Sequence, residues 1–424
     1  MTVRYLVLWP TAACDLTCPY CYRRDRRGGR MPVEVADTAL DLVAEGVRTT
    51  GQPAHVQLAG GEPTLVPSLI EHVAKRVVEI RWGKVTCGIQ TNAARLDGDI
   101  IAMLKRHSVR VGVSVDGPPP VHEKTRGSAA QTFRGLLALA HADIPVRVTT
   151  VLSALNVDHL DGLAVTLAAL PNVTGFGLDP LVAIGSATGR DELVPCDEAV
   201  INGITTLHRR LAQINALRAT PLRWRELETV RTALRRGPVP TTSAVDPAGR
   251  TLLPVANHPY CHAAIGESMA VAPDGSVYPC SQAVGDMASR AGTVHSIDWE
   301  SLRRRFSQDR HTLRGPCHRC ALAGRCPGDC PSRVEANALA DPEQRRTPLT
   351  SSTALSPVWK VHHDHPELLL GHRRRTHPRQ PSLVTATHSW SRHHPLRPHQ
   401  GSDHRPGTSP VSYTHLRAHE TGRN

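Results

Sequence analysis

Three closely spaced cysteines near the start of the chain restrict its fold more than any other feature. Cys14, Cys18 and Cys21 are separated by three and then two residues, and they follow the short apolar run Tyr5–Trp9. A loop with three thiolates at this spacing can wrap one corner of a [4Fe–4S] cube, which takes cysteine ligands. Because this loop holds no fourth cysteine, one iron would stay open for a small molecule. Zinc is the alternative on this loop alone, since cysteines at short spacing also bind zinc.

The composition is that of a globular protein with metal-ligating cysteines. The 424 residues, of which 40% are hydrophobic, suffice for two domains and a sizeable core. No apolar run is long enough to cross a membrane. We see no signal peptide and expect a cytoplasmic location. With 11 cysteines and no export signal, ligation is favoured over disulfides, because the cytosol keeps thiols reduced.

The formal net charge of +12 does not by itself indicate a nucleic-acid-binding protein. From Ser351 onward the chain has ten Lys and Arg residues against four Asp and Glu residues, so half of the net charge lies in this final part. Aromatic residues make up only 4% of the chain. We therefore expect neither a nucleic acid nor a membrane as a partner.

Short β-rich runs alternate with longer helix-like stretches up to about residue 235. This alternation predicts βαβ units with a parallel sheet and right-handed crossovers. Six such units form an α/β fold of the partial (β/α)6 TIM-like barrel type. The expected strands are 4–9, 54–58, 85–90, 110–115, 146–152 and 173–178, and the expected helices are 33–49, 68–81, 97–106, 131–142, 157–170, 197–219 and 222–235.

Residues of functional type follow five of the six predicted strands. In barrel-type α/β folds the loops after the strands carry the chemistry. Taken singly, each motif has an ordinary alternative, such as a Gly-Gly turn or a capping residue, but together they predict one active rim. In strand order they are the cysteine loop, Gly60-Gly61-Glu62-Pro63, Gln90-Thr91-Asn92, Ser114-Val115-Asp116-Gly117-Pro118 with His122 and Arg126, and Leu178-Asp179-Pro180-Leu181.

These rim motifs together resemble those of radical S-adenosylmethionine (SAM) enzymes, over roughly residues 3–235. The resemblance implies a [4Fe–4S] cluster on Cys14, Cys18 and Cys21, with SAM on the open iron. It also implies reductive cleavage of SAM to a 5′-deoxyadenosyl radical, for which the three cysteines are catalytic. The implied SAM contacts are Tyr20 near the adenine, Gly60, Gly61 and Glu62 at the methionyl amino group, Ser114 and Arg126 at the ribose or carboxylate, and the Leu178 backbone at the adenine.

A second group of cysteines begins at Cys261, and residues 269–279 between its first two members read as a hairpin with a Pro-Asp-Gly turn. By spacing alone, the last four could form a zinc site. The ordered set resembles the SPASM extension of radical SAM enzymes, which carries auxiliary [4Fe–4S] clusters. That resemblance assigns Cys261, Cys280 and Cys330 to a first auxiliary cluster and Cys317, Cys320 and Cys326 to a second. The seventh cysteine of the SPASM pattern is missing here, so one or two auxiliary clusters are expected.

The chain divides into four expected segments. They are a radical SAM core (1–235), a linker (236–258), a SPASM domain (259–350) and a tail (351–424) rich in His, Arg and Pro. Twelve of the 24 histidines lie between His362 and His419. The tail can be read as a metal-binding tract or as a disordered segment. We favour a third interpretation, that it is not native from about residue 375, because residues 410–421 resemble a translated sequencing adapter.

The SPASM-type resemblance implies a maturase that abstracts hydrogen from a ribosomally made peptide, to cross-link or oxidise it. The element at Leu178–Leu181 resembles the anaerobic sulfatase maturases, which make formylglycine. Those enzymes have a basic aspartate directly after the cysteine that matches Cys280, where this chain has Ser281, and a serine is a poor base near neutral pH. Sulfatase maturation is therefore the alternative. Radical dehydrogenation of a small molecule and a zinc-stabilised binding module are two further hypotheses.

The expected partners follow from this reaction type. They are a peptide or protein substrate and an electron donor of the flavodoxin or ferredoxin type. The sequence begins directly on the first predicted strand, so we expect substrate recognition by a separate precursor-recognition protein or by the barrel and SPASM surfaces.

Overall fold

The computed structural model describes residues 2–24, 29–80, 83–235, 260–307 and 330–340. All of them fall within one compact unit of the chain, Met1–Arg373. Several predictions lie outside the described residues: the linker, the cysteines Cys317, Cys320 and Cys326, and the tail. The boundaries of the four expected segments stay predictions.

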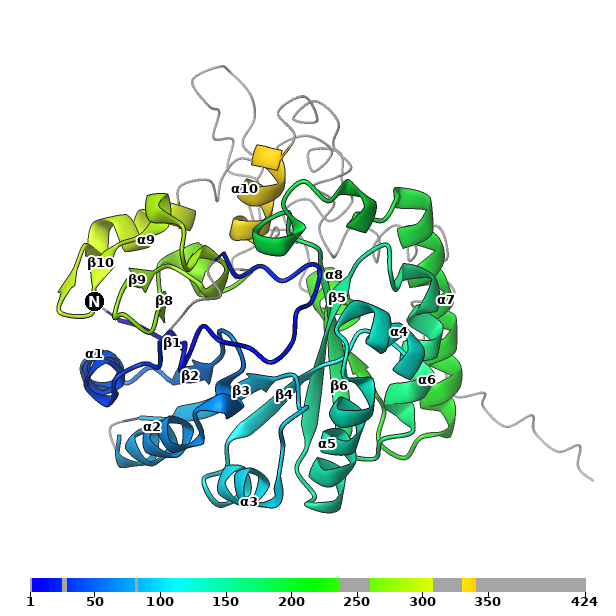
Figure 1. Cartoon of the computed structure of the whole chain (residues 1–424), viewed down its shortest axis with the longest axis horizontal. Coiled ribbons are helices and arrows are strands. Elements are labelled where there is room, and N and C mark those ends of the chain that lie inside the picture. The colour runs from blue at the N-terminus through cyan, green and yellow to red at the C-terminus, as the bar shows by residue number, and fades with distance from the viewer. Residues whose placement is uncertain (1, 25–28, 81–82, 236–259, 308–329, 341–424) are drawn as a thin grey trace, which may run out of the picture. The chain divides into compact units, whose positions relative to one another are not determined.

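A nine-stranded sheet organises the described residues, in the order β7-β6-β5-β4-β3-β2-β1-β8-β9. Strands β1 to β6 are neighbours in chain order and all run parallel, which confirms the predicted partial barrel (Figure 1). The strands are β1 (Tyr5–Leu8), β2 (Ala54–Leu58), β3 (Val85–Thr91), β4 (Arg110–Ser114), β5 (Val146–Leu152), β6 (Val173–Pro180), β7 (Arg223–Trp224), β8 (Ser268–Val271) and β9 (Val277–Tyr278). A separate two-stranded sheet pairs β10 (Gly292–Thr293) with β11 (Ser296–Ile297).

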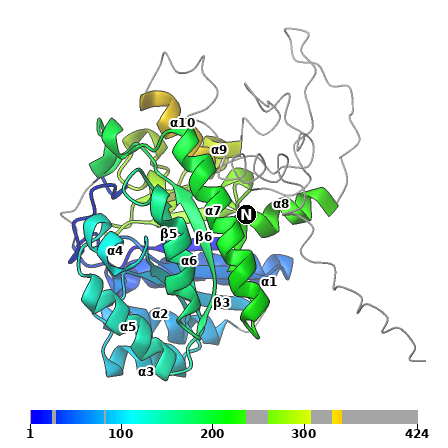
Figure 2. The ribbon, with the colours of Figure 1, turned by 90° about the vertical axis from the view of Figure 1, so that its right-hand side faces the viewer.

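The helices pack on the outer face of this sheet, with α1 to α3 over the first strands and α5 to α7 over the later ones (Figures 1 and 2). They form where apolar residues recur every three or four positions, as at Ala36, Leu40, Val43 and Val47 of α1, which are all buried. None of the helices within the described ranges is long and apolar enough to span a membrane. The helices are α1 (Val33–Thr50), α2 (Pro67–Glu79), α3 (Gly98–Arg106), α4 (Pro119–Thr125), α5 (Ala129–His141), α6 (Leu160–Ala168), α7 (Asp197–Leu217), α8 (Arg225–Arg235), α9 (Trp299–Ser307) and α10 (Pro331–Ala340).

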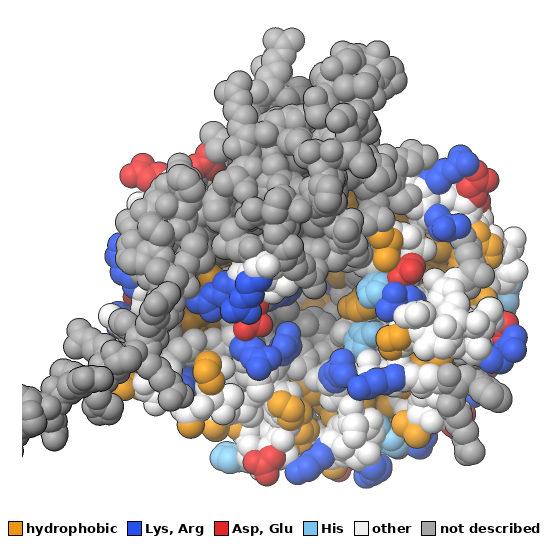
Figure 3. Space-filling model, turned by 180° about the vertical axis from the view of Figure 1, so that it is seen from behind, with side chains coloured by type: hydrophobic (Ala, Val, Ile, Leu, Met, Phe, Trp, Pro, Cys, Tyr) orange, Lys and Arg blue, Asp and Glu red, His pale blue; other side chains and the backbone are white. Residues whose placement is uncertain are grey.

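Strand β5 divides its side chains between the helices and the concave face. Val146, Val148 and Leu152 belong to the main core, whereas Arg147 and Thr149 point the other way and are less buried. Along β5 the concave face is therefore more polar than the helical side. Seen from behind, basic and acidic side chains are interspersed with apolar ones (Figure 3), as is usual for the surface of a globular protein.

Three further strands, β7 on one side and β8 and β9 on the other, extend the sheet beyond the six of the predicted barrel. Residues 223–224 pair with β6 as β7, so the helix expected from residue 222 begins at Arg225 instead. Trp224 is buried and stacks on Phe176 with the ring centroids 6.1 Å apart. This packing favours a strand at residues 223–224 over the helix that the spacing of apolar residues predicts. The predicted hairpin is confirmed as β8 and β9, but β8 also pairs in parallel with β1. The first strand of the expected second domain thus continues the sheet of the first.

The burial of α2 gives a test of this packing with two matched valines. Val73 is 0% exposed and Val78 is 68% exposed on the same helix. We expect Val73→Ala to lower the free energy of unfolding by about 2 kcal/mol, because it removes two buried carbons and leaves a cavity. Val78→Ala should change it by less than about 0.5 kcal/mol. Urea unfolding followed by circular dichroism measures both; equal effects would contradict the assigned face of α2.

Candidate functional site

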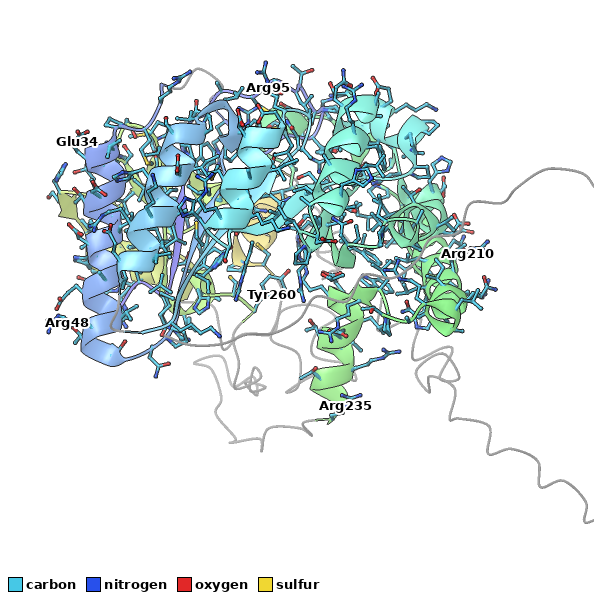
Figure 4. The ribbon with its side chains drawn as sticks, turned by 90° about the horizontal axis from the view of Figure 1, so that it is seen from below. Glu34, Arg48, Arg95, Arg210, Arg235 and Tyr260 are labelled. Carbon is cyan, nitrogen blue, oxygen red and sulfur yellow. The ribbon has the colours of Figure 1, made fainter. Side chains whose placement is uncertain are left out.

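The motifs that follow the strands lie on one rim of the sheet, at the carboxyl ends of the strands. Glu34 and Arg48 lie toward opposite ends of α1, and Arg95, which follows β3, lies at the Glu34 end (Figure 4). Arg95 donates from Nε to Asp15 Oδ2 at 3.0 Å, and Asn92 donates from Nδ2 to Asp15 Oδ1 at 2.8 Å. The residues after β3 therefore contact the cysteine loop directly, as expected for parallel strands whose ends share one edge.

The cysteine loop holds three half-buried thiols, Cys14, Cys18 and Cys21. Burial raises the pKa of Cys14 to about 11, although the Leu16 N–H at 3.5 Å from its sulfur works in the other direction. Burial likewise raises the pKa of Cys18, while the nearby Arg126 lowers it. Thiols in such surroundings ionise readily only when a metal takes the place of the proton.

Two glycines let the loop after β2 lie directly against the cysteine loop. A Cβ at Gly61 would stand 1.8 Å from the carbonyl oxygen of Ala13, and Gly60 adopts a φ of +106° beside Trp9. The backbone N–H of Gly61 donates to the Thr11 carbonyl at 2.9 Å. Only glycine permits this approach.

Glu62 accepts four hydrogen bonds from residues of the rim. Its side chain is 1% exposed, and Oε1 accepts from the Thr64 N–H, the Thr64 hydroxyl and the Thr91 hydroxyl at 3.1, 2.7 and 2.7 Å. Oε2 accepts from the Asn92 N–H at 2.8 Å. Burial raises the pKa of this carboxyl, and the four donors oppose that rise. The contact to a methionyl amino group remains a prediction. Oε2 accepts one hydrogen bond and Oε1 accepts three, so Oε2 is the better acceptor for that group.

A buried ion pair joins the cysteine loop to the loop after β4. Asp116, 1% exposed, accepts from Arg126 Nε at 2.8 Å and Nη2 at 3.1 Å. Asp116 also accepts hydrogen bonds from the Tyr20 hydroxyl and the Val151 N–H. The Arg126 guanidinium also lies 5.5 Å from the centroid of the Tyr20 ring. Two predicted cofactor-binding residues, Tyr20 and Arg126, are thus brought together by Asp116, a motif residue to which sequence reasoning assigned no role.

The other predicted SAM contacts lie on the later strands. Ser114 is half-buried at the end of β4, and its hydroxyl accepts from Gln90 Nε2 at 3.0 Å. The N–H of Leu178 donates to Glu226 Oε2 at 3.0 Å, and its carbonyl accepts from Arg225 Nη2 at 3.3 Å. The backbone groups of Leu178 that an adenine would contact are therefore already hydrogen-bonded to residues of α8. The sequence did not reveal these bonds.

Three predicted auxiliary ligands lie near one another in the extension. Burial raises the pKa of Cys280 to about 11, and the neighbouring Cys261 thiol adds to the rise. The Cys330 sulfur is 3.7 Å from Gln282 Oε1, two residues beyond Cys280. Cys261, Cys280 and Cys330 thus approach the same segment, whereas the other three predicted auxiliary ligands are outside the described residues.

Ser281 connects this extension to the cysteine loop. Its hydroxyl accepts from Trp9 Nε1 at 2.9 Å and lies 2.9 Å from the Tyr22 hydroxyl. Burial raises the pKa of Tyr22 to about 12, so its hydroxyl keeps its proton at neutral pH. No local sequence signal joins residues 9, 22 and 281, because the contact depends on β8 lying beside β1.

The donor set at the cysteine loop fits an iron–sulfur cluster. Cysteine thiolates are the usual ligands of a [4Fe–4S] cube, and this loop supplies three of them, Cys14, Cys18 and Cys21.

The close contact at Gly61 gives a test of the rim that needs no cofactor. We expect Gly61→Ala to lower the free energy of unfolding by roughly 1–3 kcal/mol or more, because the added carbon meets the backbone of Ala13. Gly98→Ala, at a helical position with nothing within 4 Å, should be neutral or raise it by up to about 1 kcal/mol. Unfolding of the apo protein measures both, and a tolerated alanine at residue 61 would refute the close packing.

Comparison with protein families identifies the first part of the barrel. Residues 10–167 match the model of the Radical SAM superfamily. Members of this superfamily use SAM together with a [4Fe–4S] cluster, and the three-thiol loop lies within the matched range. A domain of this superfamily therefore implies SAM and a [4Fe–4S] cluster as cofactors.

Curated relatives match the chain over part of their length. An uncharacterized protein of Methanocaldococcus jannaschii is 27% identical over 38% of this chain and 56% of its own length. The AdoMet-dependent heme synthase of Methanosarcina barkeri is 29% identical over 45% of this chain and 55% of its own. A cysteine-type anaerobic sulfatase-maturating enzyme of Clostridium novyi is 26% identical over 35% and 43%. The matched part thus spans about half the length of these relatives.

Solved structures share the fold over most of the chain. Native anSMEcpe with bound AdoMet superposes with a TM-score of 0.67 at 17% identity, covering 86% of this chain and 98% of that one. SuiB of Streptococcus suis bound to its precursor peptide SuiA gives 0.58 at 14% identity, covering 84% and 76%. At these identities the likeness concerns the fold. The family match identifies a radical SAM domain within residues 10–167, and the structural likeness shows that this domain and the extension share the fold of these solved proteins.

Proposed function

We propose that the protein is a radical SAM maturase that modifies a ribosomally made peptide or protein. This proposal rests on the contact between the extension and the rim. Strand β8 pairs with β1, and Ser281 lies between Trp9 and Tyr22. This contact puts a second group of cysteines next to the first. Two proteins of similar fold were solved with a peptide, anSMEcpe with Cp18Cys and SuiB with SuiA, which supports a peptide substrate here.

In this proposal Cys14, Cys18 and Cys21 would hold the cluster that binds SAM. When bound, the two cofactors would supply one-electron reductive radical chemistry for hydrogen abstraction from the substrate. Gly60 and Gly61 keep the backbone close to the cysteine loop. Cys261, Cys280 and Cys330 would hold an auxiliary cluster, and Cys317, Cys320 and Cys326 contribute to a second if it assembles.

The buried pair of Asp116 and Arg126 would orient the cofactor. Asp116 uses both carboxylate oxygens to fix the Arg126 guanidinium, and Arg126 Nη1 makes no described bond to it. A fixed guanidinium recognises a carboxylate at low entropic cost. Tyr20, held by the same aspartate, adds an aromatic surface. Ser114 would supply a hydroxyl beside them.

The reaction also defines the partners. One electron must come from an external donor, for which a flavodoxin or ferredoxin is suitable. We place the protein in the cytoplasm, where thiols stay reduced. A separate recognition protein or the barrel and extension surfaces would select the substrate.

Ser281 bears on the choice between cross-linking and sulfatase maturation. Its hydroxyl is already engaged by Trp9 and Tyr22, and a serine is a poor general base at neutral pH. This favours cross-linking or another oxidation that needs no base at residue 281. The direct test is coexpression with candidate precursor peptides and sulfatase peptides, followed by mass spectrometry. A loss of two hydrogens in a precursor supports the proposal, and formylglycine alone would establish the alternative.

The radical step depends on the cluster cysteines. We expect Cys18→Ala to abolish production of 5′-deoxyadenosine by the anaerobically reconstituted protein, because one iron loses its ligand. Cys196→Ala, which changes an exposed cysteine outside the rim, should retain it. Chromatography of the nucleoside products measures both. Unaltered 5′-deoxyadenosine from the Cys18 variant would refute the assignment.

Asp116 gives a second test of the rim. Asp116→Asn leaves the buried Arg126 charge without its partner, which costs about 3–5 kcal/mol in comparable pairs. We expect weaker SAM binding, by about tenfold or more, equivalent to about 1.4 kcal/mol. Asp99→Asn, on the exposed surface of α3, is the matched control. Equilibrium dialysis with labelled SAM under anaerobic conditions measures the affinity; equal affinities would remove Asp116 from the orienting role.

A further inference from the structure

Arg23 is a buried cation that contacts the sulfur of a cluster cysteine. It lies two residues after Cys21 and is 4% exposed. Its Nε donates to the Cys21 sulfur at 3.2 Å, and its Nη1 donates to the carbonyl of Ala12. The side chain therefore reaches back across the loop that holds all three thiols.

The charge of Arg23 has no carboxylate partner in the described part of the chain. A buried charge is costly unless an opposite charge or several hydrogen bonds compensate it. The Cys21 sulfur, at 3.2 Å from Nε, and the Ala12 carbonyl are the hydrogen-bond acceptors described for this guanidinium.

The backbone around this contact is held in place from a distant part of the chain. The N–H of Ser186 donates to the carbonyl of Cys21 at 2.8 Å. Gly185 adopts a φ of +61°, and a Cβ there would stand 2.4 Å from the same carbonyl oxygen. The loop between β6 and α7 thereby fixes the segment Cys21–Arg23, so the guanidinium keeps its direction toward the sulfur.

We propose that Arg23 is a positioning residue that raises the reduction potential of the SAM-binding cluster, through its hydrogen bond to the Cys21 sulfur and its positive charge. The inference rests on the proposed role of Cys21 as a ligand. Reduction adds one electron and makes the cluster more negative, so a fixed cation beside a ligand sulfur stabilises the reduced form. Hydrogen bonds to sulfur and local net charge are established determinants of cluster potentials.

The test compares Arg23→Gln with Arg24→Gln in the reconstituted full-length protein. Arg24 is the exposed neighbour, donates to the carbonyl of Gln282 at 2.7 Å and carries the same charge. The midpoint potential is measured by redox titration followed by electron paramagnetic resonance, and the cluster is identified by the change in its signal when SAM is added. We expect a lower potential for Arg23→Gln and an unchanged one for Arg24→Gln, at equal iron and sulfide content.

A second measurement uses the wild-type protein. It therefore gives a result even if the Arg23→Gln variant fails to take up iron. With 15N-labelled arginine, the reduced SAM-responsive cluster should show a nitrogen coupling in pulsed electron paramagnetic resonance. Absence of that coupling, or equal potentials for the wild type and Arg23→Gln, would overturn the role of Arg23. Absence of any SAM-responsive cluster in the wild type would instead overturn the proposed function.

Discussion

Two buried carboxylates, Glu62 and Asp116, hold the functional rim together. Each accepts four hydrogen bonds; the donors to Glu62 lie in its own loop, at the end of β3 and just after β3, and those to Asp116 lie in the cysteine loop, in β5 and at Arg126. A buried carboxylate is stable only while its donors stay in place. Glu62 therefore ties the loop after β2 to the end of β3, and Asp116 ties the cysteine loop to β5 and to Arg126. A cofactor placed among them meets a rim that is already ordered.

The sequence predicts the elements of this rim better than the contacts within it. Strands β2 and β5 have the predicted bounds: apolar residues alternate strictly in β2, and burial alternates along β5. The motifs after the strands were visible because glycines, cysteines and acids stood where strands end. The Trp9–Ser281 bond, the cover of Leu178 by α8 and the Arg23–Cys21 contact were not, because each depends on side-chain direction or on distant segments meeting in space. Residues 223–224 were misread as helix since Trp224 gains more by packing on Phe176.

The two groups of cysteines share one folded framework in the described residues. β8 adds to the barrel sheet, and the extension also packs on Trp9 and Ala12 in a common apolar cluster with Ala270 and Tyr278. Clusters bound to the two groups of cysteines would therefore be held at a fixed separation. Any electron transfer or substrate binding between them would take place at a distance set by the sheet.

The position of β1 also matters for how the chain is made. β1 lies inside the sheet, with β2 on one edge and β8 on the other, and Tyr5 meets Ser268 across that second edge. Its second partner is synthesised 263 residues later, which at ordinary translation rates is about 10 to 50 s. During that time β1 presents an unpaired apolar edge of the kind that recruits other strands. In a nascent chain of this protein, one edge of the first strand therefore stays without its native partner until the extension has been synthesised.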